Sequence, residues 1–188
     1  IHNQESESEN EMFMMRKGKL LNIIKKKGID MSWFTSTGKN ALQSISKYFP
    51  SNSKILLVHN TFTTRSDIDF LKNNNFFSRV WFSLCPKANL FIEGQLPDVT
   101  MLQKQNCKLT IGTDSLASND TLSILAELIV IQTAFPHISA ESLLTFATKN
   151  GADYFGWSDL GSFTAGTKPG VISITNASQQ KLNSNSTV

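Results

Sequence analysis

The residues best suited to metal-assisted chemistry stand at the ends of apolar, β-prone runs. Asp114 follows Leu-Thr-Ile-Gly-Thr, and His59 follows Ile-Leu-Leu-Val. His2 and Glu5 stand at the start of the chain in the order His-x-x-Glu. Imidazole and carboxylate groups bind divalent metal ions, and carboxyl groups also act as acids and bases. Together these four residues predict half of a metal site.

Each of these residues also has a structural interpretation when it is considered alone. An aspartate such as Asp114, in a strand-to-helix loop, is more often a turn residue or a helix cap. A histidine after an apolar run, such as His59, is a satisfied structural residue about as often as a ligand. His2 and Glu5 could be neighbours on a helix surface. The combination of the four residues is what favours chemistry.

The elements that must position these residues follow from the apolar patterns. Runs near residues 1, 55, 80 and 109 predict four strands, and the segments between them have helical periodicity. This βαβα order predicts a parallel sheet. Such sheets bind ligands at the carboxyl ends of their strands, where the polar residues gather. The patterns also predict a loop at 85–89, helices at 121–135 and 140–150, and a last strand at 171–174.

Composition bounds the class of protein and its partners. The chain has 188 residues, of which 40% are hydrophobic and 18% charged, as in soluble globular proteins. A net charge of +3 gives no argument for nucleic acid, and the basic residues between 15 and 27 are interpreted as a solvated helix face. No apolar run of about 18 residues predicts a membrane span, and no signal peptide is recognised. The two cysteines are spaced as neither a metal clip nor a redox pair, which predicts a reduced, cytoplasmic protein.

The segments around the polar residues resemble the amidohydrolase superfamily, in particular its aminohydrolase branch of deaminases and chlorohydrolases. The resemblance extends over residues 1–175 and rests on His-Asn-Gln-Glu at 2–5, Leu-Val-His-Asn at 57–60, Ser-Leu-Cys-Pro-Lys-Ala-Asn-Leu at 83–90 and Ile-Gly-Thr-Asp-Ser-Leu-Ala-Ser-Asn at 111–119. It implies an α/β fold, the C-terminal half of a (β/α)₈ TIM-type barrel with parallel strands five to eight.

The resemblance also divides the chain. Residues 1–165 would form the barrel half, and residues 166–176 would return as a strand of a small β-domain. Residues 177–188, rich in Ser and Asn, are expected to be a disordered tail. A complete barrel needs roughly 250 residues. The chain begins with Ile1 rather than Met, and the family's His-x-His pair of strand one is absent. We therefore expect a C-terminal part of a longer protein, inactive by itself.

Roles for the four residues follow from the resemblance. His2 would be a metal ligand, and Asp114 both a metal ligand and the base that takes the proton of water. Glu5 would carry a proton to the ring nitrogen of the substrate, and His59 would orient or polarise the attacking hydroxide. A metal ion lowers the pKa of its water from about 15.7 to about 7. Since no lysine ends a predicted strand to bridge two ions, the resemblance implies one divalent ion, Zn²⁺ or Fe²⁺.

The implied activity is metal-dependent hydrolysis of a non-peptide C–N bond in a small molecule, first of all deamination of an aminated heterocycle. The alternatives are a cyclic amide hydrolase, a chlorohydrolase of the same family, or a truncated, non-catalytic barrel module. A homodimer is compatible with the resemblance. Leu84 stands where many relatives have a histidine that helps to shape the pocket, which argues against the usual nucleoside-deaminase substrates but not against the metal chemistry. Asn89, Ser118 and Asn119 match residues expected to hold the loops through backbone hydrogen bonds.

Overall fold

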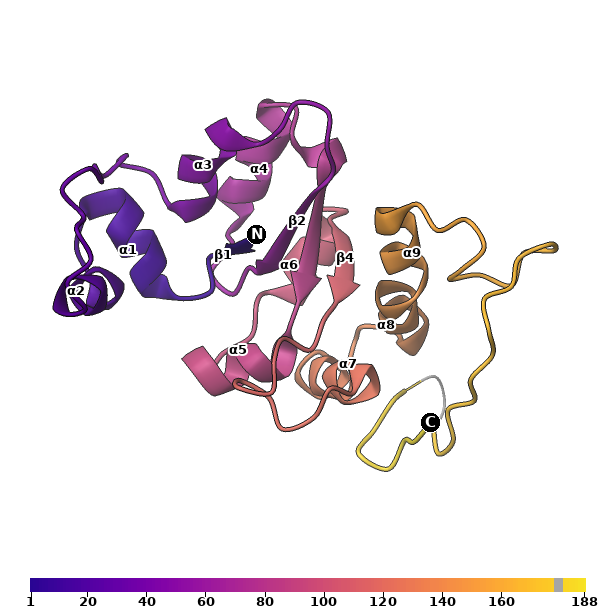
Figure 1. Cartoon of the computed structure of the whole chain (residues 1–188). Helices are drawn as coiled ribbons and strands as arrows, with labels where there is room; N and C mark the ends of the chain where they lie inside the picture. The colour runs from indigo at the N-terminus through magenta and orange to yellow at the C-terminus, as the bar shows by residue number, and fades with distance from the viewer. Residues whose placement is uncertain (178–180) are drawn as a thin grey trace.

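A parallel sheet of four strands, in the order β1-β2-β3-β4, forms the centre of the computed structural model, which describes residues 1–177 and 181–188 (Figure 1). The strands are β1 (His2–Asn3), β2 (Ile55–His59), β3 (Val80–Leu84) and β4 (Lys108–Ile111). Strands adjacent in the sheet are also consecutive in the sequence, and every pair is parallel. This confirms the predicted α/β class and the positions of the four strands.

Helices connect the strands and cover the sheet. Between β1 and β2 lie α1 (Glu7–Met15), α2 (Lys19–Lys26), α3 (Ala41–Ile45) and the 3₁₀ helix η1 (Ser46–Tyr48). Between β2 and β3 lie α4 (Arg65–Asn73) and η2 (Phe77–Arg79), and between β3 and β4 lie α5 (Pro86–Glu93) and α6 (Val99–Lys104). After β4 come α7 (Ile124–Ala134), α8 (Ala140–Ala147) and α9 (Lys149–Phe155). Among the described residues, none of the helices has the length and apolar character of a membrane span.

The main core lies between the sheet and its helices. Leu57, Phe82 and Leu109, one from each of β2, β3 and β4, are fully buried in it. The central strand β3 is buried at all five positions, which is expected for a strand covered on both faces. On one of these faces the ring of Tyr154 in α9 lies 5.9 Å from that of Trp81. β2 alternates between buried and partly exposed positions, so the continuous apolar runs predicted the positions of both central strands but complete burial only for β3.

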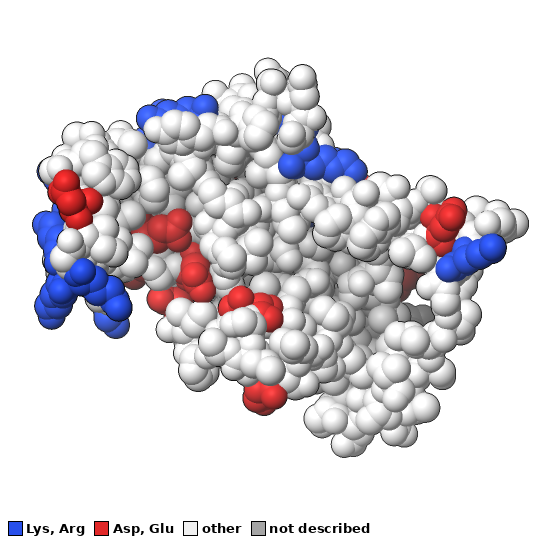
Figure 2. Space-filling model, in the orientation of Figure 1, with Lys and Arg blue, Asp and Glu red and all other residues white. Residues whose placement is uncertain are grey.

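A second, smaller cluster holds α1 and α2 together at the indigo end of the chain (Figure 1). Its buried members are Met12, Leu21, Met31 and Phe34. The lysines of α2 and of the turn after it are exposed. Figure 2 shows the resulting concentration of basic side chains over this end of the molecule. The basic segment is therefore a solvated helix face, as predicted.

Two helical segments differ from the prediction. The expected loop at 85–89 is the first part of α5, which begins with Pro86 and ends at Gly94 in the left-handed conformation. Proline fits the first helical turn because it lacks only an N–H that would have no partner there. The helix expected at 140–150 is divided at Thr148 into α8 and α9. Its predicted stop, Gly151, lies inside α9, and Gly156 ends that helix with φ 74°.

The prediction of a last strand at 171–174 is wrong. These residues are in no strand, and Val171 and Ile172 are 80% and 70% exposed. Alternating apolar residues need a partner strand to satisfy their backbone groups, and none lies beside this segment in the described part of the chain. A single antiparallel bridge joins Thr175 to Thr187. The strand of a small β-domain is thus not formed within the described residues 166–176.

The C-terminal tail was expected to be disordered over residues 177–188. Residues 178–180 lie outside the described part of the chain. Of the described remainder, Leu182 is only 4% exposed and packs against the main core, and Ser186 is also buried. Ser186 Oγ accepts a hydrogen bond from the backbone N–H of Asn183 at 3.1 Å. This part of the tail is therefore packed and bonded, because its one leucine finds a place in the core.

A buried carboxylate connects the end of β1 with α3 and α4. Asp67, in the first turn of α4, accepts hydrogen bonds at 2.9 Å from both the N–H and the hydroxyl of Thr64, which caps the helix. It also accepts from the side-chain amides of Gln43 at 3.0 Å, Gln4 at 3.3 Å and Asn40. Gln4 precedes Glu5, so this network fixes the chain where it leaves β1.

We predict that Asp67→Ala lowers the free energy of unfolding by about 3 kcal/mol, because buried donors that lose a charged acceptor remain unsatisfied. Asp69→Ala, on the same helix, is the control. Asp69 is half exposed, and its oxygen lies 3.9 Å from Arg65 Nε. Its loss should therefore cost less than about 1 kcal/mol. Urea unfolding of both variants measures the difference, and equal midpoints would show that the network contributes nothing.

Candidate metal centre

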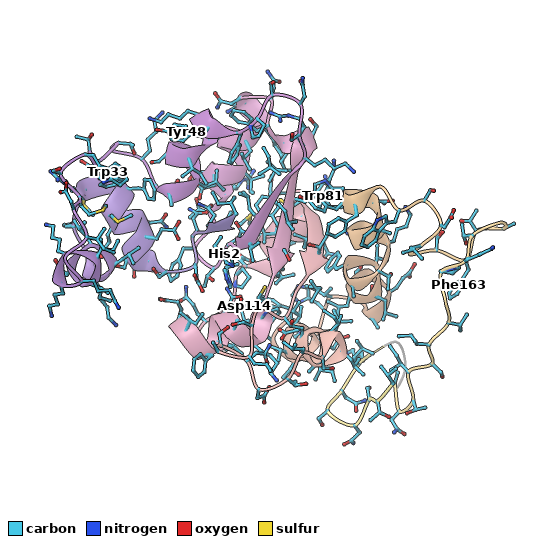
Figure 3. The ribbon with its side chains drawn as sticks, in the orientation of Figure 1. His2, Trp33, Tyr48, Trp81, Asp114 and Phe163 are labelled. Carbon is cyan, nitrogen blue, oxygen red and sulfur yellow. The ribbon has the colours of Figure 1, made fainter. Side chains whose placement is uncertain are left out.

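Three strand ends bring His2, His59 and Asp114 together. His2 lies in β1, His59 ends β2, and Asp114 lies in the loop after β4. One ligand atom from each, an imidazole nitrogen or a carboxylate oxygen, can be chosen so that all three lie within 4.8 Å of one another. Figure 3 shows the labelled side chains of His2 and Asp114 close together at the ends of the strands. The predicted convergence of these residues is confirmed.

His59 is the buried member of the group. Its side chain is fully buried, while that of Glu5 is 31% exposed, and Nε2 of His59 lies 3.4 Å from Oε1 of Glu5. Its ring centroid lies 5.2 Å from that of His2. Within the described residues, neither ring nitrogen of His59 has a hydrogen-bond partner. A buried polar atom without a partner is costly, so these nitrogens fit a site that is completed by a ligand.

Burial keeps His59 in the neutral form that can bind a metal ion. Burial lowers the pKa of His59 below its usual value, and the nearby carboxylates of Glu5 and Asp114 offset this only in part. The ring is therefore neutral at physiological pH, as metal coordination requires. Burial raises the pKa of Asp114. Hydrogen bonds from Ser118 and from the backbone of Ser115, together with the two nearby imidazoles, outweigh this effect, so the pKa lies below its usual value. Asp114 is thus ionised, and the donor set suits a divalent cation.

Left-handed backbone conformations turn the chain at these strand ends. The φ angles of Gln4, His59, Asn60 and Asp114 are 49°, 74°, 56° and 55°. For residues other than glycine such conformations cost about 1–3 kcal/mol each and concentrate at functional sites. Asn60 relieves part of this cost because its side-chain amide donates to the carbonyl of Leu57 at 2.9 Å. The sharp turns aim the side chains of three separate strand ends at one place.

The loop residues have roles close to those predicted. The amide of Asn119 donates to the backbone carbonyl of Thr113 at 2.8 Å, as expected for a residue that holds the loop. Ser118 differs in that its hydroxyl donates to the carboxylate of Asp114 as well as to a backbone carbonyl. Asn89 differs also, because its buried amide donates to a side-chain hydroxyl, that of Thr61. Leu84, expected to alter the pocket, is fully buried in the main core.

Glu127 in α7 is the polar residue beside the site that sequence reasoning missed. It is fully buried and accepts hydrogen bonds from the side chain of Asn119 and from the backbone N–H of Lys87. Burial raises the pKa of Glu127, and these two hydrogen bonds oppose the shift. The signal was present in the sequence, since Glu127 is the only charged residue in the largely apolar helix Ile124–Ala134.

Comparison with known proteins identifies the family. The model of the amidohydrolase family matches residues 23–188. The chain therefore belongs to the amidohydrolase family. This agrees with the resemblance on which the sequence analysis relied, and with the parallel α/β sheet.

Two curated relatives are deaminases. The chain is 32% identical over 145 residues to a 5-methylthioadenosine/S-adenosylhomocysteine deaminase of Teredinibacter turnerae, covering 73% of this chain and 32% of the relative. It is 26% identical over 128 residues to a 5'-deoxyadenosine deaminase of Methanococcus aeolicus, covering 64% of this chain and 29% of the relative. The chain thus spans about a third of the length of the relatives it matches.

Solved structures share the fold. Helicobacter pylori aminofutalosine deaminase in complex with methylthio-coformycin superposes with a TM-score of 0.71 at 22% identity, covering 86% of this chain and 39% of that one. An adenosine deaminase of Xanthomonas campestris with bound zinc gives 0.58 at 23% identity, with coverages of 86% and 33%. Atrazine chlorohydrolase of Arthrobacter aurescens complexed with zinc gives 0.55 at 23%, with coverages of 66% and 29%. The described sheet therefore has the fold of a part of these proteins.

We predict that neither cysteine reacts rapidly with a thiol reagent in the native protein at about pH 8, because the thiolate is the reactive form. Cys85, directly after β3, and Cys107 are both buried, and burial raises the pKa of each thiol to about 12. Titration with a chromogenic disulfide should detect two thiols after unfolding in denaturant. Rapid stoichiometric labelling of the native protein would contradict the buried, protonated state.

Proposed function

We propose that the protein is a metal-dependent hydrolase that deaminates an aminated heterocycle. The observation that carries this proposal is the convergence of His2, His59 and Asp114, with Glu5 beside His59. Membership of the amidohydrolase family and the deaminase names of the curated relatives support it. A binding module without catalysis would have no need for two imidazoles and two carboxylates at one strand edge.

In this proposal His2 and Asp114 hold one divalent cation, Zn²⁺ or Fe²⁺. The zinc present in the structures of the deaminase and chlorohydrolase with this fold supports Zn²⁺. When bound, the cation supplies Lewis-acid chemistry and makes water available as a nucleophile near neutral pH. The remaining ligands would come from residues outside this chain's four strands. We therefore propose that the four strands are strands five to eight of a barrel, and that activity requires the natural full-length protein.

The protein's own groups would move the protons. Ionised Asp114 would bind the cation through one carboxylate oxygen and accept the proton of the attacking water on the other, while the hydroxyl of Ser118 donates to its Oδ2 at 2.5 Å. His59, neutral and fixed by burial, orients that water. The carboxyl of Glu5, which is 31% exposed, would donate its proton to the ring nitrogen of the substrate, take the second proton of the added water and pass it to the departing ammonia. Glu5 and Asp114 would then return to their starting forms by exchanging protons with solvent. Positioned acids and bases of this kind contribute about 10²–10⁴-fold to a rate.

We propose a 6-aminopurine nucleoside as the substrate class. The names of the curated relatives, as deaminases of methylthioadenosine, S-adenosylhomocysteine and 5'-deoxyadenosine, support this choice. The fold shared with atrazine chlorohydrolase supports a chlorinated triazine as the second candidate. The two candidates differ in the leaving group, because ammonia needs a proton to leave and chloride does not. Glu5, as a proton donor, favours the aminated substrate.

The direct test uses the natural full-length protein. We expect one zinc or iron ion per chain by elemental analysis, and release of ammonia from 5'-deoxyadenosine or 5'-methylthioadenosine. Removal of the ion by a chelator should abolish the release, and added metal should restore it. Two metal ions per chain would contradict the single-ion site. A metal-loaded protein that releases chloride from a chlorotriazine, but no ammonia from any aminated heterocycle, would replace deamination by the second candidate.

The acids have separable roles, which we predict from two isosteric variants of the full-length protein. Asp114→Asn should abolish turnover and lower metal content, because it removes a charged ligand and the base together. Glu5→Gln should retain the metal and lower kcat for ammonia release by about 10²–10⁴-fold, because it removes only the proton donor. Metal content and kcat are measured for both variants, on an aminated heterocycle and on its chlorinated analogue.

The chlorinated analogue serves as the control for Glu5, since its leaving group requires no protonation and the loss of kcat should be smaller. Loss of metal from Glu5→Gln as complete as from Asp114→Asn would make Glu5 a ligand and remove the basis for its assigned role. Full turnover by both variants would place the active site elsewhere.

A further inference from the structure

We infer that Glu127, a buried carboxylate of α7, is a positioning residue that sets the geometry of Asp114 through the side chain of Asn119. The inference rests on the proposed role of Asp114 as a metal ligand and adds a residue that does not touch the site itself. Glu127 acts indirectly: it binds the amide of Asn119, which in turn binds the peptide carbonyl preceding Asp114.

Both carboxylate oxygens of Glu127 are hydrogen-bonded inside the protein. Its side chain is fully buried, and each carboxylate oxygen has one donor. Oε1 accepts from the amide of Asn119 at 2.6 Å, and Oε2 accepts from the backbone N–H of Lys87 at 2.8 Å. Two donors that converge on one side chain require two acceptors. A carboxylate offers both, whereas an amide at this position would offer one acceptor and set its N–H₂ group against a donor.

The amide of Asn119 joins Glu127 to the backbone at Asp114. The amide nitrogen that donates to Glu127 also donates to the carbonyl of Thr113 at 2.8 Å. That carbonyl belongs to the peptide unit between Thr113 and Asp114, so its direction constrains the φ angle of Asp114. This angle is 55°, in the left-handed region that aspartate adopts only at a cost. The bond from Asn119 therefore helps to hold a conformation that the local sequence does not favour.

The same loop is also anchored from its other side. The hydroxyl of Ser118 donates to Oδ2 of Asp114 at 2.5 Å, which fixes the carboxylate once the backbone is in place. At Gly112 a β-carbon would lie 3.2 Å from Oγ of Ser83 and 3.3 Å from Sγ of Cys85, so the loop begins close against β3 and the turn after it. Between these two contacts, the hydrogen bond from Asn119 orients the peptide plane between Thr113 and Asp114.

Glu127 also fixes the neighbouring helix. Glu127 accepts a hydrogen bond from the backbone N–H of Lys87, which lies in the first turn of α5, where a negative charge is favourable. One carboxylate thus connects α7, the start of α5 and the loop that carries Asp114. Removal of the carboxylate frees the amide of Asn119 to rotate away from Thr113. The expected result is a looser Asp114 and a weaker metal site in a protein that remains folded.

The experiment measures zinc affinity in the natural full-length protein by competition with a chromogenic chelator, with circular dichroism as the check on folding. We expect Glu127→Gln to weaken zinc binding by about 10–100-fold, the range found when residues that orient metal ligands are changed. Asn119→Ala should weaken it by a similar factor although no charge is lost. The double variant should bind zinc with the same affinity as the single variant that binds it less tightly, because both changes break the same series of hydrogen bonds.

Gln132→Leu is the matched control. Gln132 is a second buried polar residue of α7, and its amide donates to the carbonyl of Ile138 at 2.8 Å, away from the Asp114 loop. The substitution removes a buried hydrogen bond from the same helix at nearly constant volume. We expect it to lower thermal stability and to leave zinc affinity unchanged.

Several outcomes would overturn the inference. Zinc affinity in Glu127→Gln equal to that of the wild type would show that the carboxylate has no positioning role. A loss in Glu127→Gln with none in Asn119→Ala would mean that charge, and not the bond to Thr113, is responsible. An equal loss in Gln132→Leu would reduce the effect to the stability of α7. A wild-type protein that binds neither zinc nor iron would contradict the proposed function and the inference with it, whereas the other outcomes leave the proposed function intact.

Discussion

The site depends on a constraint of backbone geometry. Parallel strands deliver their carboxyl ends to the same edge of the sheet, but an extended chain would carry its side chains past that edge. The left-handed turns at Gln4, His59, Asn60 and Asp114 stop the chain there. Each turn is unfavourable by itself, and those at Gln4, Asn60 and Asp114 are held by hydrogen bonds from Gln4 to Asp67, from Asn60 to Leu57 and from Asn119 to Thr113. The hydrogen bonds of these buried polar residues therefore stabilise the turns that place the site residues.

The strands could be predicted from the sequence because their signal is local. Four continuous apolar residues before His59, and a similar run from Val80, have the pattern of strands covered on both faces. The roles of the site residues came from a resemblance and not from periodicity. Their meeting at one edge follows from the parallel order alone, which is why His2 and Asp114 could be paired across 112 positions of sequence.

What could not be predicted depends on partners distant in the sequence. The segment 171–174 has the pattern of a strand but lacks a neighbour in the described chain. Pro86 permits either a loop or the first turn of a helix, and the packing of α5 against α7 decides between them. Glu127 is visible as a charge within an apolar helix, yet the donors it serves come from a helix and a loop that periodicity does not place.

The separate cluster of Met12, Leu21, Met31 and Phe34 has a consequence for motion. A unit with its own small core can open by local unfolding at a lower free energy than the whole domain. The helix α1 within this unit begins two residues after Glu5, whereas His59 ends β2 and Asp114 lies in the loop after β4. Hydrogen exchange in α1 and α2 should thus be faster than in β2 and β3. Glu5 thus lies between Gln4, which hydrogen bonds hold to Asp67, and a unit that can open more readily, so opening of this unit could change access to the site while His59 and Asp114 stay in place.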